Sequence, residues 1–339
     1  MERPHEGGEL PTGRGELSAA LVDALRGEPG KGRGALPDAP AADGADPHGV
    51  DPYGDDLQLA LYVCYELHYR GFEGVEDSWE WDPELLRFRA GLERCFLGRL
   101  RADVPAGADV SAALEELLVE PGDGTGPSAF LQGEGELWQL REYAAHRSLY
   151  QLKEADPHAW AIPRLTGRAK AAFVTVEYDE FGAGRAERIH ARLFAGLMQD
   201  LGLDDTYGRY LGHAPATTLA TVNLMSLFGL HRALRGSLVG HFATVEATSP
   251  PGARRLVTAM ERLGAGPAAM HFYAEHVEAD AVHEQLVRRE VIGDLLRREP
   301  GLAGDVAFGI AATQWLEERF GEPLISAWRA GMSSLRLPL

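Results

Sequence analysis

The sequence has little of several features that mark common protein classes. It has two cysteines in 339 residues, too few for a disulfide framework, which favours a reducing compartment such as the cytoplasm. It contains no apolar run as long as a membrane span, and its first residues lack the basic-then-apolar order of a secretory signal. Its formal net charge of −18 argues against a nucleic-acid surface or an anionic membrane as partner. The composition predicts a cytoplasmic protein that binds neither.

Strand-like alternation of apolar and polar residues is also nearly absent. From Asp55 onward, apolar residues recur at three- and four-residue spacing, between turns that contain glycine and proline. We therefore expect the fold class to be all-α, as a helical bundle. The expected helices cover residues 17–26, 55–69, 83–102, 109–119, 134–155, 167–181, 185–201, 217–228, 231–248, 252–263, 267–298 and 303–320.

Composition divides the chain into three parts. Residues 1–54 are rich in glycine, proline and acidic residues and have few large apolar ones, which predicts a flexible N-terminal tail with one short helix. Residues 55–127 form a predicted helical extension, which ends at the sequence PGDGTGP of residues 121–127. Residues 128–339 are the predicted main domain.

The most informative segment is HVEADAVH, residues 276–283. It places His276, Asp280 and His283 at i, i+4 and i+7, so that they share one face of a helix. Imidazole and carboxylate are usual ligands of iron, zinc and manganese. A motif this short also arises by accident, so it predicts a metal site only if other helices bring similar groups to the same place.

Three further helices carry ionisable residues in apolar surroundings. Glu246 is flanked by Val245 and small residues, which predicts a buried position. A buried carboxylate is costly unless it is paired or metal-bound. The alternatives to a metal ligand at this position are a helix-capping glutamate and a surface glutamate. His190 stands at the margin of an apolar stripe, where a lone histidine is more often a satisfied core residue than a ligand. Glu154 continues the helical phase of Leu149 and Tyr150 and so can face inward.

One more carboxylate is expected, and two positions compete for it. Of Glu177, Asp179 and Glu180, only Glu180 lies close to the Gly-Ala-Gly break at 182–184 and can turn toward the next helix. Glu187 instead forms Glu-x-x-His with His190, the di-iron signature of ferritin-like bundles. Both positions stay open.

Together these groups make a site rich in nitrogen and oxygen and free of thiolate. Such a set favours iron or manganese, and two metal ions rather than one, whereas a structural zinc needs four ligands and usually cysteines. The predicted ligands are Glu154, Glu180, His190, Glu246, His276, Asp280 and His283.

The ligand pattern resembles the heme-oxygenase-like diiron oxidase family, also described as iron-containing redox enzymes. In that pattern a glutamate precedes a histidine by thirty-six residues, as Glu154 precedes His190 here. Glu246 then follows on the next core helix, and the His-x-x-x-Asp-x-x-His segment completes the set. The resemblance covers about residues 134–300, and the family's variable extra carboxylate falls at or near Glu180, with Glu187 as its competitor.

The resemblance implies a heme-oxygenase-like helical bundle without haem, here with extra N-terminal helices. It implies two Fe(II) ions, with manganese as a substitute, and O2 as co-substrate. The expected reaction is oxidation of a small organic substrate by N-oxygenation, C–C cleavage or desaturation. The resemblance assigns the catalytic role to the ligands themselves. It is compatible with a reductant or reductase as a partner and with a homodimer. The catalytic set is Glu154, His190, Glu246, His276, Asp280 and His283.

Two other functions remain open at this point. A ferritin-like metal-handling protein would use Glu187 with His190 and Asp280 with His283, but it would leave His276 without a role. A non-catalytic helical binding module would make the histidine-rich segment accidental.

Overall fold

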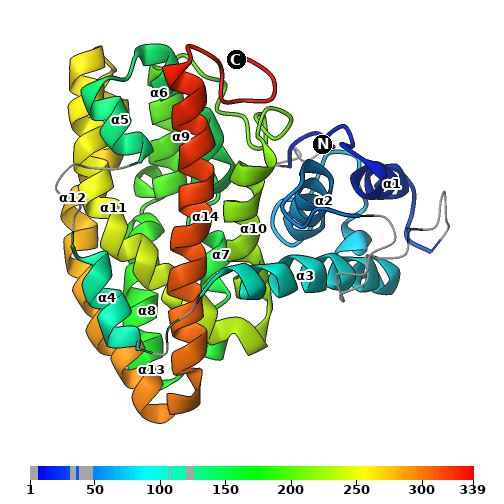
Figure 1. The fold of residues 1–339 in the computed structure, drawn as a ribbon, viewed down its shortest axis with the longest axis horizontal. Helices are drawn as coiled ribbons and strands as arrows, with labels where there is room; N and C mark the ends of the chain where they lie inside the picture. Colours follow the sequence, from blue (N-terminus) through cyan, green and yellow to red (C-terminus); the bar gives the residue numbers. More distant parts are fainter. Residues whose placement is uncertain (1–6, 31–35, 38–48, 106, 108, 120–125) are drawn as a thin grey trace. The chain divides into compact units, whose positions relative to one another are not determined.

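The structure is a computed structural model that describes residues 7–30, 36–37, 49–105, 107, 109–119 and 126–339, without the side chains of residues 278–282. Within these residues there is no β-strand, and the only extended pairing is a parallel bridge between Gly8 and Phe72. The prediction of an all-α fold is confirmed (Figure 1). The helices group into two compact units.

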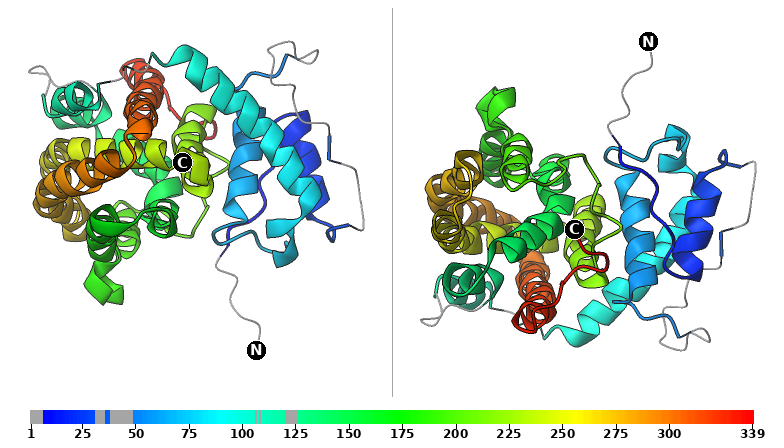
Figure 2. Two further views of the ribbon diagram at one scale, coloured as in Figure 1. Left: turned by 90° about the horizontal axis from the view of Figure 1, so that it is seen from below. Right: turned by 90° about the horizontal axis from the view of Figure 1, so that it is seen from above.

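Unit 1 contains the described residues up to Asp103, together with residues 206–223 and 336–338. Figure 2 shows its first three helices side by side in blue and cyan. Between the second and third, a short 3-10 helix covers Asp77–Trp81. The helices are α1 (Glu16–Leu25), α2 (Asp55–Glu66), α3 (Pro83–Asp103) and the first part of α10 (Ala216–Leu230).

Part of the predicted N-terminal tail is folded into unit 1. In α1, Leu21 and Leu25 are completely buried. The α1 helix begins without a side-chain cap of its own, and the carboxylate of Asp56 accepts hydrogen bonds from the backbone N–H groups of Leu17 and Ser18 at 3.0 and 2.7 Å. Helix α2 thus supplies the N-terminal acceptor that α1 lacks. Composition alone did not reveal this contact between distant segments.

Unit 2 contains residues 104–205 as far as they are described, with 224–335 and Leu339. Helix α11 packs against both α12 and α14 and is central to the bundle (Figure 1). The core of unit 2 includes four buried phenylalanines, each on a different helix, at residues 173, 194, 242 and 272. The helices are α4 (Val110–Leu117), α5 (Pro127–Gly133), α6 (Leu137–Gln151), α7 (Asp156–Ala159), α8 (Gly167–Glu180), α9 (His190–Asp200), the end of α10, α11 (Arg235–Leu263), α12 (Pro267–Leu286), α13 (Gly293–Arg298) and α14 (Ala303–Arg329).

The units group the chain differently from the boundaries expected at residues 54 and 127. Residues 104–119 fall in unit 2, while 206–223 join unit 1. Short 3-10 segments connect the longer helices of unit 2, and one π-helical segment continues α12 into α13. These segments are Ile162–Arg164, Gly182–Gly184, Ala186–Arg188, Arg232–Leu234, Val287–Ile292 (π) and Pro300–Leu302.

Several expected helix boundaries differ from the structure. The helix expected over 134–155 covers only Leu137–Gln151, so Glu154 lies beyond its end, and the helix expected over 303–320 extends to Arg329. Helix α11 runs unbroken through Pro250 and Pro251, where the sequence predicted a stop. Packing against α12 and α14 holds this helix on two sides, and tertiary contacts override the local cost of proline. The helix expected over 185–201 begins only at His190, because residues 182–188 form two 3-10 turns, and Ala183 has a positive φ of 52°.

None of the helices in the described part of the chain is both long and apolar enough to cross a bilayer.

Candidate metal centre

The predicted ligands come from five segments of unit 2. Glu154 lies in the turn between α6 and α7, Glu180 is the last residue of α8, and His190 is the first residue of α9. Glu246 lies on α11, while His276 and His283 lie on α12. These six side chains are all buried, with exposed fractions of 2–7%. Helix ends and turns, rather than helix interiors, supply three of them.

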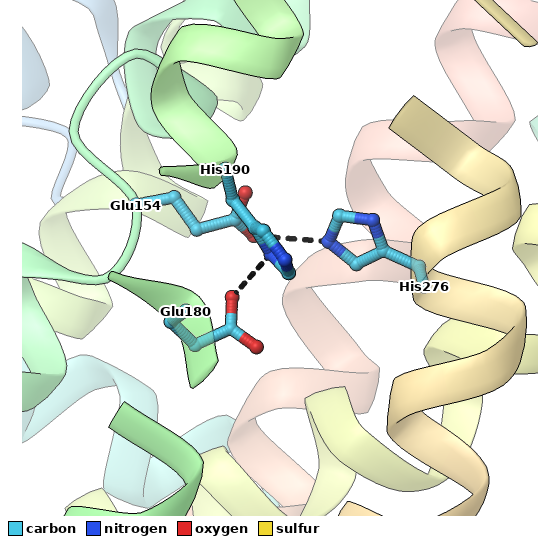
Figure 3. Close-up of side chains that lie close together, drawn as sticks. All are labelled: Glu154, Glu180, His190 and His276. Carbon is cyan, nitrogen blue, oxygen red and sulfur yellow. Dashed lines mark ion pairs between the residues drawn. The ribbon is translucent and has the colours of Figure 1, made fainter. Parts of the chain in front are cut away.

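The first ligand group brings together Glu154, Glu180, His190 and His276 (Figure 3). Each offers one ligand atom, and these atoms lie within 4.8 Å of one another. Nδ1 of His190 is 2.6 Å from Oε2 of Glu180, and Nε2 of His276 is 3.7 Å from Oε1 of Glu154. The 3-10 turns that replace the start of the expected helix allow Glu180 and His190 to meet.

The second ligand group contains Glu180, Glu246 and His283, whose ligand atoms also lie within 4.8 Å of one another. Nδ1 of His283 is 3.3 Å from Oε2 of Glu246 and 3.8 Å from Oε1 of Glu180. Glu180 therefore belongs to both groups.

Two histidines are held in the tautomer that a ligand needs. Nδ1 of His276 lies 2.8 Å from the carbonyl oxygen of Phe272, so Nδ1 carries the proton and Nε2 turns its lone pair to the first group. Nε2 of His283 lies 3.1 Å from a carboxylate oxygen of Asp179, so its lone pair is on Nδ1, toward the second group. Metal-binding histidines are commonly oriented in this way by a carbonyl or carboxylate behind them.

Contacts within the first group shift the pKa values of its members. Burial acts to raise the pKa of Glu180, but its hydrogen bond to His190 and the charge of that ring outweigh burial and lower it. The same contact raises the pKa of His190 against the effect of burial. Burial raises the pKa of Glu154. In the metal-free protein, a proton on His190 therefore stabilises the Glu180 carboxylate, and a bound cation would replace that proton.

Glu177 is a buried carboxyl group that was not among the predicted ligands. Neither of its oxygens has a hydrogen-bond partner among the described residues. Burial, together with the charges of Glu180, Glu246, Asp156 and Glu154, raises its pKa to about 9. It is therefore a neutral acid near pH 7 in the metal-free protein.

The structure separates the two candidates for the extra carboxylate. Glu180 lies in both ligand groups, whereas Glu187 is exposed, in the 3-10 segment before α9. Asp280 lies on α12, and its side chain is outside the described residues. Asp179 is the contact that sequence reasoning missed, since helix periodicity does not show which carboxylate lies behind a histidine of another helix.

The donor set fits an ion of iron or manganese. Carboxylate oxygens and imidazole nitrogens face one another in buried space, and these ligands suit such ions. Both cysteines lie in unit 1, on α2 and α3, so neither belongs to the group.

A cavity of about 640 Å³ opens beside the ligands. Glu154, Glu180, Glu246 and His276 form part of its wall. A different part is formed by Arg147, whose guanidinium binds Glu317 of α14 through two hydrogen bonds of 3.0 and 2.7 Å. The cavity has room for a small organic molecule in contact with the ligand groups.

The part of the chain that contains these residues matches a known protein family. A sequence model of the family described as "Iron-containing redox enzyme" matches residues 141–318, which are more than half of the chain and include every predicted ligand. The chain is also similar to nitrosourea synthase from Streptomyces achromogenes subsp. streptozoticus, with 24% identity over 232 residues. That match covers 66% of this chain and 49% of the relative, so this chain spans about half the length of the curated relative it matches.

Proposed function

Because this chain belongs to the family of iron-containing redox enzymes, we propose that its two ligand groups hold a pair of iron ions that use O2 to oxygenate a nitrogen of a small organic molecule. Membership of the family makes this chain an iron-dependent oxidoreductase. Our proposal concerns the number of iron ions, the co-substrate and the type of reaction.

The position of Glu180 carries the proposal of two ions. It offers ligand atoms to both groups, and a carboxylate shared in this way would join two neighbouring ions. Glu154, His190 and His276 would complete the site of one ion. Glu246 and His283 would bind the other, with Asp280 as the further ligand expected from its position on α12.

Bound Fe(II) would supply the electrons that O2 reduction requires, and Mn(II) would suit the same ligands. The chain's own contribution is to hold the ligand side chains in place within a buried site. The Phe272 carbonyl and Asp179 hold two histidines in the ligating tautomer, and the six described ligands are buried. A substrate bound in the adjoining cavity would lie against the ligand groups, because Glu154, Glu180, Glu246 and His276 form part of its wall.

The type of reaction is supported by the relative. The name nitrosourea synthase refers to a product with an oxidised nitrogen, which favours nitrogen oxygenation over C–C cleavage or desaturation for this chain. The ferritin-like alternative required Glu187 and His190 on one helix. In the structure Glu187 is exposed and precedes α9, so this alternative loses one of its ligand pairs.

Anaerobic titration with Fe(II), followed by O2, tests the proposal. We expect about two iron ions per chain, O2 consumption, and a change in the visible spectrum when O2 is admitted. Glu180→Gln should reduce the bound iron at both positions, because Gln cannot supply the shared carboxylate. Glu187→Gln is the matched control and should behave as the wild type.

Other outcomes would contradict the proposal. One ion per chain in the wild type would exclude the paired site. Slow uptake of many ferric ions per chain would support storage, and the absence of O2 consumption would support a binding module.

A further inference from the structure

Four buried residues outside the ligand groups form a continuous hydrogen-bond series along the wall of the cavity. Oη of Tyr150 lies 3.3 Å from Nδ1 of His158, and Nε2 of His158 lies 3.1 Å from Nε2 of His241. Nδ1 of His241 lies 2.9 Å from Oγ1 of Thr313. All four side chains are at most 8% exposed and line the same cavity as the ligands. We call them the Tyr150–Thr313 series.

The far end of the series fixes its direction. Oγ1 of Thr313 lies 2.7 Å from the carbonyl oxygen of Gly309. A carbonyl oxygen only accepts hydrogen bonds, so the single proton of the Thr313 hydroxyl must lie in this contact. Toward His241, Thr313 can therefore only accept, and Nδ1 of His241 must carry a proton.

Both histidines are neutral near pH 7. Burial and the charge of His241 lower the pKa of His158 well below its ordinary value, and burial lowers the pKa of His241 to about 4. A neutral imidazole has one N–H donor and one acceptor nitrogen. Since Nδ1 of His241 is the donor, its Nε2 is the acceptor and receives the Nε2–H of His158.

The near end of the series is then determined. Nδ1 of His158 has no proton, so it accepts the O–H of Tyr150. The phenol proton is thereby directed to His158. Tyr150 lines the same cavity as Glu154, Glu180 and Glu246. Burial, and after it the charges of the neighbouring carboxyl groups, raises the pKa of Tyr150, so the phenol stays protonated.

We propose that the Tyr150–Thr313 series makes the phenol oxygen of Tyr150 a hydrogen-bond acceptor for an N–H or O–H group of the substrate, held beside the ligand groups. His158, His241 and Thr313 are positioning residues, and Tyr150 is a substrate-binding residue. The proposal rests on the proposed function, and it narrows the substrate class to molecules with a hydrogen-bond donor near the atom that is oxidised.

The chemistry around Tyr150 explains why the direction matters. Without the acceptor nitrogen of His158, the Tyr150 O–H would donate its hydrogen bond to a carboxylate that lines the same cavity, and a carboxylate oxygen engaged in that way is a poorer metal ligand. The acidic groups on the α14 side of the cavity, Glu317, Glu318 and Glu322, are acceptors in their ionised form and cannot fix this direction. The series therefore separates the phenol proton from the ligands.

The first experiment needs no iron, so its result is independent of the proposed function. In metal-free protein with 15N-labelled histidine, the ring-nitrogen chemical shifts report which nitrogen is protonated. We expect Nε2–H for His158 and Nδ1–H for His241. Thr313→Val should disturb the signals of His241, and Thr313→Ser should restore them. A wild-type His241 protonated on Nε2 would reverse the series and overturn the proposal.

The second experiment measures the acceptor role in the anaerobic Fe(II)-loaded protein. The probes are propylammonium and N,N,N-trimethylpropylammonium, which carry the same charge but differ in having N–H groups. In each protein the preference is the Kd of the trimethyl probe divided by the Kd of propylammonium. We expect this ratio to be about five- to tenfold larger in the wild type than in Tyr150→Phe, which corresponds to the loss of one hydrogen bond. An equal preference in the two proteins, or no binding of propylammonium by the wild type, would contradict the proposal.

Discussion

At the scale of single residues, the groups behind the candidate ligands orient them. His283 faces Glu246 and Glu180 with one ring nitrogen and Asp179 with the other. Asp179 is 45% exposed at its side chain, so a substitution there disturbs the core little. This makes Asp179 a suitable position to separate ligand orientation from folding.

We expect Asp179→Asn to weaken metal binding without unfolding the protein. An amide can still contact the ring but no longer fixes Nε2 of His283 as the donor, and loss of such a partner typically costs about 10- to 100-fold in metal affinity. Competition with a metal chelator measures the affinity, and Glu187→Gln is the exposed control. Unchanged affinity in Asp179→Asn would show that Asp179 does not orient the ligand.

Because the pKa of Glu177 is raised, we expect the stability of the metal-free protein to depend on pH more strongly in the wild type than in Glu177→Gln. Its folded-state pKa of about 9 lies above the ordinary value of 4.5, so the folded state retains this proton where the unfolded state has lost it. The metal-free protein should therefore lose stability as pH rises from 4.5 toward 9. Glu177→Gln, which stays neutral, should be less affected.

Thermal unfolding in the presence of a chelator measures this difference. At pH 5 the Tm values of wild type and Glu177→Gln should be similar, and at pH 8.5 the variant should be higher by about 5 °C. A variant that is equally or less stable than the wild type at pH 8.5 would show that Glu177 is not held as a neutral acid.

At the scale of the helices, the approach of α11 to α14 places His241 and Thr313 within hydrogen-bond distance. Two glycines permit it. A Cβ atom at Gly240 would lie 2.1 Å from the carbonyl oxygen of Val306, and one at Gly309 would lie 2.1 Å from that of Ser237. Backbone atoms cannot move aside as a flexible side chain can, so both positions require glycine.

We expect Gly309→Ala to destabilise the protein by about 1–3 kcal/mol or more, because it forces two backbones apart. Gly304→Ala, on the same helix, is the control: nothing lies within 4 Å of its Cβ position. That control should be neutral or stabilising by up to about 1 kcal/mol, since alanine favours helix. Chemical denaturation measures both. Equal stability of the two variants would mean that the helices do not approach as described.

At the scale of the whole molecule, the site joins segments that are far apart in the sequence. At least one candidate ligand lies in each of five segments: the turn after α6, the end of α8, the start of α9, and helices α11 and α12. An ion bound by these groups would connect five segments of unit 2. Metal binding should therefore stabilise the folded state as any ligand specific to that state does.

Metal loading should raise the Tm and slow amide hydrogen exchange in α8, α9, α11 and α12, with helix α3 of unit 1 as the internal control. At metal concentrations about 100 times the Kd, the gain is about 2.7 kcal/mol. The gain should shrink on acidification, because protons compete with the metal for His190, whose pKa is raised by Glu180 despite burial. A uniform change in exchange across both units would argue against a site made of these segments.

Much of the fold was predictable because helix formation is local. Three- and four-residue spacing identified the long helices, including α8, α12 and α14. Residue chemistry and helix position placed Glu154, His190, Glu246 and His276 in one candidate set. In the structure Glu246 lies in the second group and the other three lie in the first, with Glu180 in both. Their function as metal ligands stays a prediction, as does the role of Asp280.

The sequence alone predicted an all-α fold, because helical periodicity is local, and it marked residues whose chemistry suits a metal. The family entered as a resemblance of the ligand pattern, and the family model then matched residues 141–318. Only the tertiary structure shows that Glu180 lies among the buried carboxylates and imidazoles while Glu187 is exposed, since a pair of 3-10 turns separates the two positions. It also decided which groups lie behind the ligands, such as Asp179 and the Tyr150–Thr313 series. Those contacts join separate helices, and their distances depend on how the helices pack, which spacing along one helix does not specify.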